Sequence, residues 1–204
     1  MGKTRVVCSA MIEDTVPPFL KNSGKGWLTA EYNMLPASSD KRVTRERAKV
    51  GGRTHEIQRL IGRALRMSIE TNLLGERSIL VDCDVLDADG GTRTASITGS
   101  YVAVVLALKK VMGMMPSISQ VHKIAVAAVS VGMVKGVACL DLNYEEDRDA
   151  EVDMNIVKTS EGKFVEVQGT AESKPYRMED LTTLLQLADK GIKELIEIQK
   201  RAIG

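Results

Sequence analysis

Residues Gly90 to Gly99, GGTRTASITG, combine residue types that suit anion binding at a point where a predicted strand gives way to a helix. The first turn of a helix offers backbone N–H groups without partners, and these attract anions. Glycine lets a ligand approach the backbone, while Thr92 and Arg93 add a hydroxyl and a planar guanidinium that suit phosphate. The stretch indicates an anion site, although an ordinary turn with Thr92 or Thr94 as the helix N-cap fits the same residues.

A second stretch, GGRTHEIQRLIGR from Gly51 to Arg63, repeats this pattern of two glycines and an arginine at a predicted helix start. A positive charge in the first turn of a helix is unfavourable against the helix dipole. An anion held by Arg53 would remove that cost, so we expect Arg53 to take part in anion binding.

An acidic stretch runs from Leu140 to Asp153. Asp141 lies between Leu140 and Leu142 in a predicted strand, where a carboxylate is unfavourable without a partner or a metal. Asp141 and Asp147 are therefore candidates to hold Mg²⁺ or to protonate a leaving oxygen. A solvated acidic turn is the ordinary alternative, and a calcium loop is disfavoured because its glycine and its terminal glutamate are missing.

Other kinds of catalytic centre lack the residues that they need. The only histidines are His55 and His122, which nearly excludes a histidine metal site, and neither a nucleophile elbow nor a glycine-rich nucleotide motif is present. No uninterrupted apolar run approaches the ~20 residues of a membrane span, and the N-terminus does not resemble a signal peptide. Three separated cysteines predict reduced thiols in a cytosol: Cys8, Cys83 and Cys139. We expect a soluble cytoplasmic protein.

The charges are segregated along the chain although the net charge is only +1. Residues 37–66 carry nine basic and three acidic side chains, whereas residues 139–153 carry seven acidic side chains and one basic. Such asymmetry within a neutral chain is a better indication of a functional site than the net charge is.

Hydrophobic periodicity predicts one mixed α+β domain over residues 1–204, with residues 37–51 as a basic mobile loop. Alternating or continuous apolar runs predict strands at 6–12, 27–34, 79–85, 124–134, 137–142, 152–159 and 163–168. Apolar residues at helical spacing predict helices at 54–72, at 92–112 and from 179 onward.

Five motifs in this order resemble the ribonuclease PH family: VPPFLKNSGKGWLTAEYNMLP, GGRTHEIQRLIGR, GGTRTASITG, LDLNYEEDRDAEVDMN and VEVQGTAE. The resemblance covers nearly the whole chain. It implies a βαβ fold typical of phosphorolytic exoribonucleases. It also implies an enzyme that trims the 3′ ends of tRNA precursors with inorganic phosphate and releases nucleoside diphosphates, as a hexameric ring with Mg²⁺.

By position, the resemblance assigns roles to particular residues. Phosphate binding falls on Arg53, Gly91, Thr92 and Arg93, catalysis and metal binding fall on Asp141 and Asp147, and RNA binding falls on Arg42 and Arg45. The chain differs from the family in two respects, because it lacks the family's N-terminal segment and carries Ala37 where the family places an arginine. The second difference implies weaker binding of RNA.

The residue types also fit phosphorolysis, because phosphate is already a nucleophile at neutral pH and needs no histidine base. A catalytically silent, RNA-binding subunit of an exosome-like ring is the alternative function. A metal-binding domain without nucleic acid would leave the basic loop unexplained.

Overall fold

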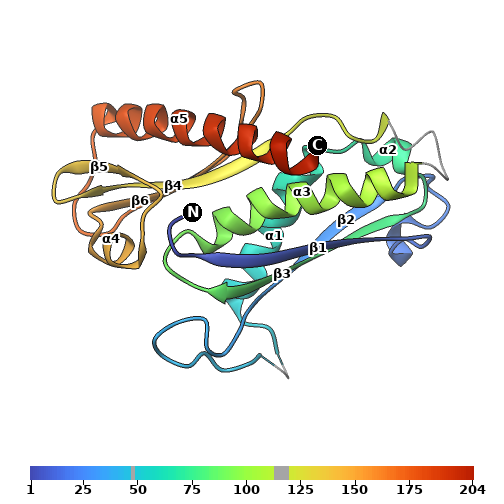
Figure 1. Cartoon of the computed structure of the whole chain (residues 1–204), viewed down its shortest axis with the longest axis horizontal. Helices are drawn as coiled ribbons and strands as arrows, with labels where there is room; N and C mark the ends of the chain where they lie inside the picture. The colour runs from blue at the N-terminus through green and yellow to red at the C-terminus, as the bar shows by residue number, and fades with distance from the viewer. Residues whose placement is uncertain (47–48, 113–119) are drawn as a thin grey trace.

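The computed structural model describes residues 1–46, 49–112 and 120–204, and it stacks two sheets and their helices in four layers (Figure 1). A three-stranded sheet forms one outer layer, and helices α1 (Gly52–Arg66) and α3 (Thr92–Met112) cover it. A four-stranded sheet follows, and the closing helix α5 (Met178–Ile203) forms the other outer layer. The expected α+β class is confirmed.

The first sheet contains β1 (Arg5–Glu13), β3 (Ser78–Asp87) and β2 (Trp27–Met34) in that order. The pair β1 and β3 is antiparallel, whereas β2 and β3 are parallel. A parallel pair needs a crossover connection, and α1 supplies it, so these three elements form a βαβ unit. The ends of β2 and β3 and the starts of α1 and α3 consequently lie near one another.

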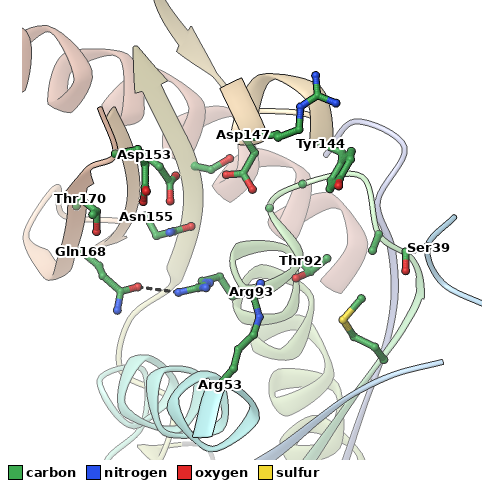
Figure 2. Close-up of a pocket in the computed structure, with 18 residues that line it drawn as sticks. Ser39, Arg53, Thr92, Arg93, Tyr144, Asp147, Asp153, Asn155, Gln168 and Thr170 are labelled. Atoms are coloured by element: carbon green, nitrogen blue, oxygen red, sulfur yellow. Dashed lines mark hydrogen bonds between the residues drawn. The ribbon is translucent and has the colours of Figure 1, made fainter. Parts of the chain in front are cut away.

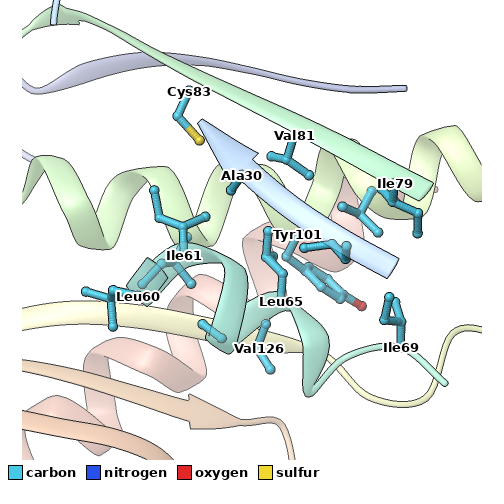
Figure 3. Packing of buried hydrophobic residues seen from close by; sticks show 14 of the residues in the cluster. Ala30, Leu60, Ile61, Leu65, Ile69, Ile79, Val81, Cys83, Tyr101 and Val126 are labelled. Carbon is cyan, nitrogen blue, oxygen red and sulfur yellow. The ribbon is translucent and has the colours of Figure 1, made fainter. Parts of the chain in front are cut away.

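The main hydrophobic core fills the space between the first sheet and helices α1 and α3 (Figure 3). Ile61 and Leu65 of α1 are fully buried against Ile79 and Val81 of β3 and Tyr101 of α3, as their spacing on each element predicts. The helix ends at Arg66 and not near residue 72: the backbone N–H groups of Met67 and Ser68 donate to the carbonyls three residues back, and Ile69 then pairs with His122 in an isolated β-bridge. A short separate helix, α2 (Thr71–Leu74), follows.

The second sheet is antiparallel and has the order β5 (Val137–Leu140), β4 (Val126–Val134), β6 (Val152–Thr159) and β7 (Phe164–Ala171). Strand β4 is buried on both faces: Val126 and Ala128 contact the first core, while Ala127 and Val129 contact α5. This double burial explains why β4 is apolar at nearly every position and does not alternate.

By length and composition alone, residues Thr92–Val111 of helix α3 could cross a membrane. Half of this apolar segment is buried inside the protein. It packs against β1, β4 and α5 at once. Its apolar character is therefore that of a central core helix.

Two expectations for the acidic stretch need correction. Strand β5 ends at Leu140, because Asp141 adopts a left-handed conformation with φ of 58° and its backbone N–H donates to the Ser130 carbonyl at 2.8 Å. A helix, α4 (Tyr144–Asp149), then occupies what the sequence suggested was a turn. Its start is fixed by a reciprocal capping box between Asn143 and Glu146, a spacing that is visible in the sequence.

Candidate functional site

A cavity of about 700 Å³ opens where the two sheets and the starts of α1, α3 and α4 meet (Figure 2). Its lining is mainly polar, with Arg53 and Arg93 on one side and Asp147 and Asp153 on the other (Figure 2). The polar lining residues are Ser39, Arg53, Thr92, Arg93, Ser130, Tyr144, Asp147, Arg148, Asp153, Asn155, Gln168, Thr170 and Glu172.

Arg53 and Arg93 each occupy the second position of a helix, α1 and α3, and both line the cavity. Both helix starts therefore bring unpaired backbone N–H groups as well as a guanidinium. The backbone at the start of α3 lies very close to the backbone of the acidic stretch, and this contact depends on Gly90, whose φ is 76°. A Cβ at this position would lie 2.1 Å from the Leu142 carbonyl oxygen. Only glycine allows the start of α3 to pass directly beneath the acidic stretch.

Thr92 is oriented by a buried tyrosine. The Tyr32 side chain is 3% exposed, and its hydroxyl donates to the Thr92 Oγ1 at 2.9 Å. Because a hydroxyl can accept and donate at once, this contact leaves the hydrogen of Thr92 available for a ligand in the cavity.

Three carboxylates line the cavity: Asp147 on α4, Asp153 on β6 and Glu172 directly after β7. Burial and, after it, the charge of Asp147 raise the pKa of Asp153 to about 6 against the opposing effect of Arg93. One buried oxygen of Asp153 has no hydrogen-bond partner among the described residues. The pKa of Asp147 is also raised above its ordinary value, because desolvation outweighs the opposing charges of Arg93 and Arg53. The arginines and the aspartates therefore act on one another across the cavity.

Asp141 does not line this cavity. Burial raises the pKa of its carboxyl group, and a Cβ on Gly91 would lie 3.7 Å from its Oδ1, so Asp141 lies next to the cavity wall without lining the cavity. The sequence argument that selected Asp141, an acid within a buried strand, applies equally to Asp153. Asp153 and Asn155 are two residues apart on β6 and so point to the same side, into the cavity (Figure 2).

We expect Asp153→Asn to stabilise the fold near neutral pH by about 1 to 2 kcal/mol, after allowance for solvent screening of a partly exposed group. The folded pKa of about 6 lies above the ordinary value of 3.8, so the wild-type protein loses stability as pH rises from 4 to 6, whereas the asparagine variant does not. Urea unfolding of both proteins at pH 4 and pH 7.5 measures this difference. An equal difference at both pH values would contradict the assignment of the raised pKa to Asp153.

The carboxylates fit a magnesium ion that is shared with a substrate. Mg²⁺ is usually held by one or two carboxylates together with water and substrate phosphates. Asp147 and Asp153 with the unpartnered oxygen supply that donor set, and no group of three or more acidic, histidine or cysteine ligands occurs among the residues that the structure describes.

The basic segment 37–51 has no helix or strand over its described residues, and Arg47 lies outside them. Arg42 and Arg45 are both exposed. A second cavity of about 360 Å³ is lined by Thr44, Arg45 and Glu46, and it shares Arg53 with the first cavity. The segment therefore leads from solvent to the arginine side of the site.

Comparisons with known proteins decide the family. A model of the 3′ exoribonuclease family, domain 1, matches residues 1–110, and a model of domain 2 of that family matches residues 125–191. The whole chain is 55% identical to ribonuclease PH of Moorella thermoacetica, of which it covers 82%, and 53% identical to ribonuclease PH of Bacillus subtilis, of which it covers 84%. The chain belongs to the ribonuclease PH family.

As a ribonuclease PH, the chain is an enzyme, a phosphate-dependent 3′→5′ exoribonuclease with inorganic phosphate as substrate. The resemblance drawn from the five motifs is confirmed. The fold is also that of rice Rrp46, with a TM-score of 0.78 at 14% identity over 99% of this chain and 84% of that one. An Archaeoglobus fulgidus exosome structure described with RNA bound to the active site gives a TM-score of 0.77 at 18% identity, over 97% of this chain and 80% of that one.

Proposed function

We propose that this enzyme binds inorganic phosphate between Arg53 and Arg93 and cleaves the last phosphodiester of an RNA beside Asp147 and Asp153. One observation carries the proposal: two helix starts with their arginines line the same cavity as the carboxylates of Asp147 and Asp153. A site that joins one anion to another needs positive charge to bring them together and acidic groups where the leaving oxygen departs.

In the proposed reaction, an oxygen of phosphate attacks the terminal phosphorus of the RNA while the bond to the 3′ oxygen of the preceding nucleotide breaks. The products are a nucleoside diphosphate and an RNA one nucleotide shorter, whose 3′ oxygen takes up a proton. Arg53, Arg93 and the Thr92 hydroxyl offset the repulsion between the two anions, and Gly91 lets phosphate approach the backbone. No histidine lies among the described lining residues, and phosphate needs none to attack.

The two aspartates act at the leaving oxygen. With a pKa of about 6, Asp153 can carry a proton near neutral pH, whereas an ordinary aspartate is fully ionised there. Asp147 and Asp153 are also the residues that would hold Mg²⁺. A bound ion would require both carboxylates to be ionised, and it would then take the place of the proton in stabilising negative charge on the bridging phosphoryl group and the departing oxygen. Asp141 has no part in this proposal because it lies outside the cavity.

The substrates we propose are the 3′ ends of tRNA precursors, and the working form is a cytoplasmic hexameric ring. The family model and the full-length identity to ribonuclease PH support this reading, and they do not favour a silent ring subunit. The basic segment supports an RNA substrate that is longer than the nucleotides in the cavity, because Arg42 lies outside both cavities and is exposed.

The experiment that tests the function is degradation of a CCA-ended RNA with and without phosphate. We expect degradation only with phosphate, and nucleoside diphosphates as the products. Monophosphates formed equally well without phosphate would contradict phosphorolysis.

A separate prediction concerns the basic segment. Replacing Arg42 and Arg45 by alanine should weaken binding of a tRNA-sized substrate at every sequence and flatten its salt dependence, because phosphate contacts position RNA without reading bases. Binding of the tRNA-sized substrate and of a trinucleotide is measured at two salt concentrations. A trinucleotide, which reaches only the cavity, should bind almost unchanged, and an equal loss for both substrates would place the two arginines in the active site.

A further inference from the structure

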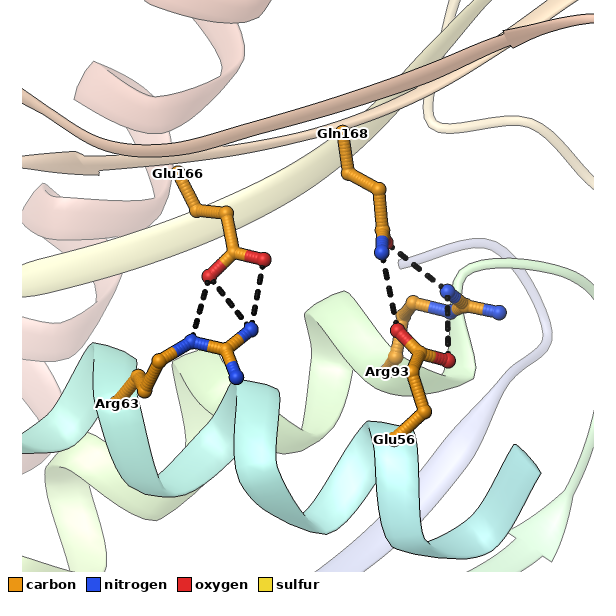
Figure 4. Close-up of polar contacts among 5 residues, drawn as sticks. All are labelled: Glu56, Arg63, Arg93, Glu166 and Gln168. Atoms are coloured by element: carbon orange, nitrogen blue, oxygen red, sulfur yellow. Dashed lines mark hydrogen bonds and ion pairs between the residues drawn. The ribbon is translucent and has the colours of Figure 1, made fainter. Parts of the chain in front are cut away.

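A chain of polar contacts that joins three elements fixes one side of the Arg93 guanidinium (Figure 4). Its Nη1 donates to the Gln168 Oε1 at 3.0 Å, and the Gln168 Nε2 donates to the Glu56 Oε1 at 3.0 Å. The Glu56 Oε2 also lies 3.5 Å from the Arg93 Nη1. Arg93 belongs to α3, Gln168 to β7 and Glu56 to α1, so three elements distant in the sequence converge on one guanidinium.

The chemistry of this contact chain requires an amide in the middle. A guanidinium can only donate hydrogen bonds and a carboxylate can only accept them. An amide offers one acceptor and one donor group, so Gln168 can join Arg93 to Glu56 in only one orientation. The two neighbours thereby fix the orientation of the amide, and the amide fixes the position of the Arg93 Nη1.

We propose that Gln168 and Glu56 are positioning residues that prearrange Arg93 for phosphate. This inference rests on the proposed phosphate site. A free arginine side chain loses conformational freedom when it binds an anion, and a side chain that is already held loses less. The contacts engage Nη1, and the remaining nitrogens of Arg93 stay available on the other side of the guanidinium (Figure 4).

The protein contains a matched control for this idea. Arg63 of α1 donates to Glu166 of β7, with Nη2 to Oε1 at 2.9 Å and Nε to Oε2 at 3.2 Å (Figure 4). Arg63 lies seven residues, about two helical turns, from Glu56, and Glu166 lies on the same side of β7 as Gln168. This ion pair joins the same helix to the same strand, yet neither residue lines the cavity.

The test compares Gln168→Met with Arg63→Met, measuring phosphate binding by calorimetry and phosphorolysis at varied phosphate concentration. We expect Gln168→Met to raise both the Kd and the KM for phosphate by roughly 5- to 10-fold, as the loss of about one hydrogen bond predicts. The effect on kcat should be much smaller, because a prearranged arginine favours bound phosphate and the transition state alike. Arg63→Met should leave the KM for phosphate within about two-fold. Equal effects of both variants would show that the contacts only dock α1 on β7, and the inference would be wrong.

A double-variant cycle separates an action through Arg93 from a direct contact between Gln168 and phosphate. In an Arg93→Met background, Gln168→Met should have no further effect on the Kd for phosphate. Additive effects would overturn the inference. If Arg93→Met alone leaves the Kd unchanged, the proposed phosphate site itself is wrong, whereas a large effect of Arg93→Met with none of Gln168→Met rejects only the positioning role.

Discussion

Turnover is expected to fall by roughly 10³-fold when either Asp147 or Asp153 is replaced by asparagine, while phosphate and RNA still bind. Both residues line the acidic side of the cavity, and asparagine keeps their size but removes the negative charge and the ability to carry a proton. Single-turnover degradation of a CCA-ended RNA measures the chemical step, and calorimetry measures phosphate binding. For Asp153→Asn the same variant should be more stable than the wild-type protein near neutral pH, so lost activity cannot be attributed to unfolding.

Asp141→Asn is the matched control. Asp141 belongs to the same acidic stretch but does not line the cavity, so its replacement should leave turnover within about three-fold of wild type. A large loss in Asp141→Asn with near-normal turnover in Asp153→Asn would reverse the assignment and restore Asp141 to the reaction.

Arg53→Met and Arg93→Met should each raise the phosphate concentration needed for half-maximal rate and lower kcat/KM by on the order of 10²-fold. Each change removes a charge-assisted contact worth roughly 1.5–3 kcal/mol, in a cavity where the two guanidiniums also offset the repulsion between phosphate and RNA. Thr92→Ala should have a smaller effect because it removes a neutral donor. Initial rates at varied phosphate concentration measure all three.

Arg59→Met tests whether the loss of any positive charge on α1 is sufficient to change the phosphate dependence of the rate. Arg59 is exposed and does not line the cavity, so its replacement should leave the phosphate dependence unchanged. If Arg53→Met and Arg93→Met also leave it unchanged, phosphate binds elsewhere on the protein.

The sequence alone determined most of the secondary structure, because periodicity depends on which face of an element is buried. The ranges expected for β2, α3 and β6 agree with the structure residue for residue. The positions of Arg53 and Arg93 in the first turns of two helices were also predictable, since both residues come shortly after glycines that precede a helical pattern. Anion binding by these helix starts stays a prediction. These features are local, and neighbouring residues in the chain are sufficient to specify them.

The tertiary structure alone decided which acid faces the arginines. An acid in a buried strand is unfavourable without a partner, and this argument applied to both Asp141 and Asp153. In the structure Asp153 on β6 lines the cavity, whereas Asp141 lies in a turn after β5 and does not. The contact between Gln168 and Arg93 joins residues 75 positions apart, and that between Gln168 and Glu56 joins residues 112 positions apart. No local pattern marks such contacts, because they arise only when the second sheet packs against α1 and α3.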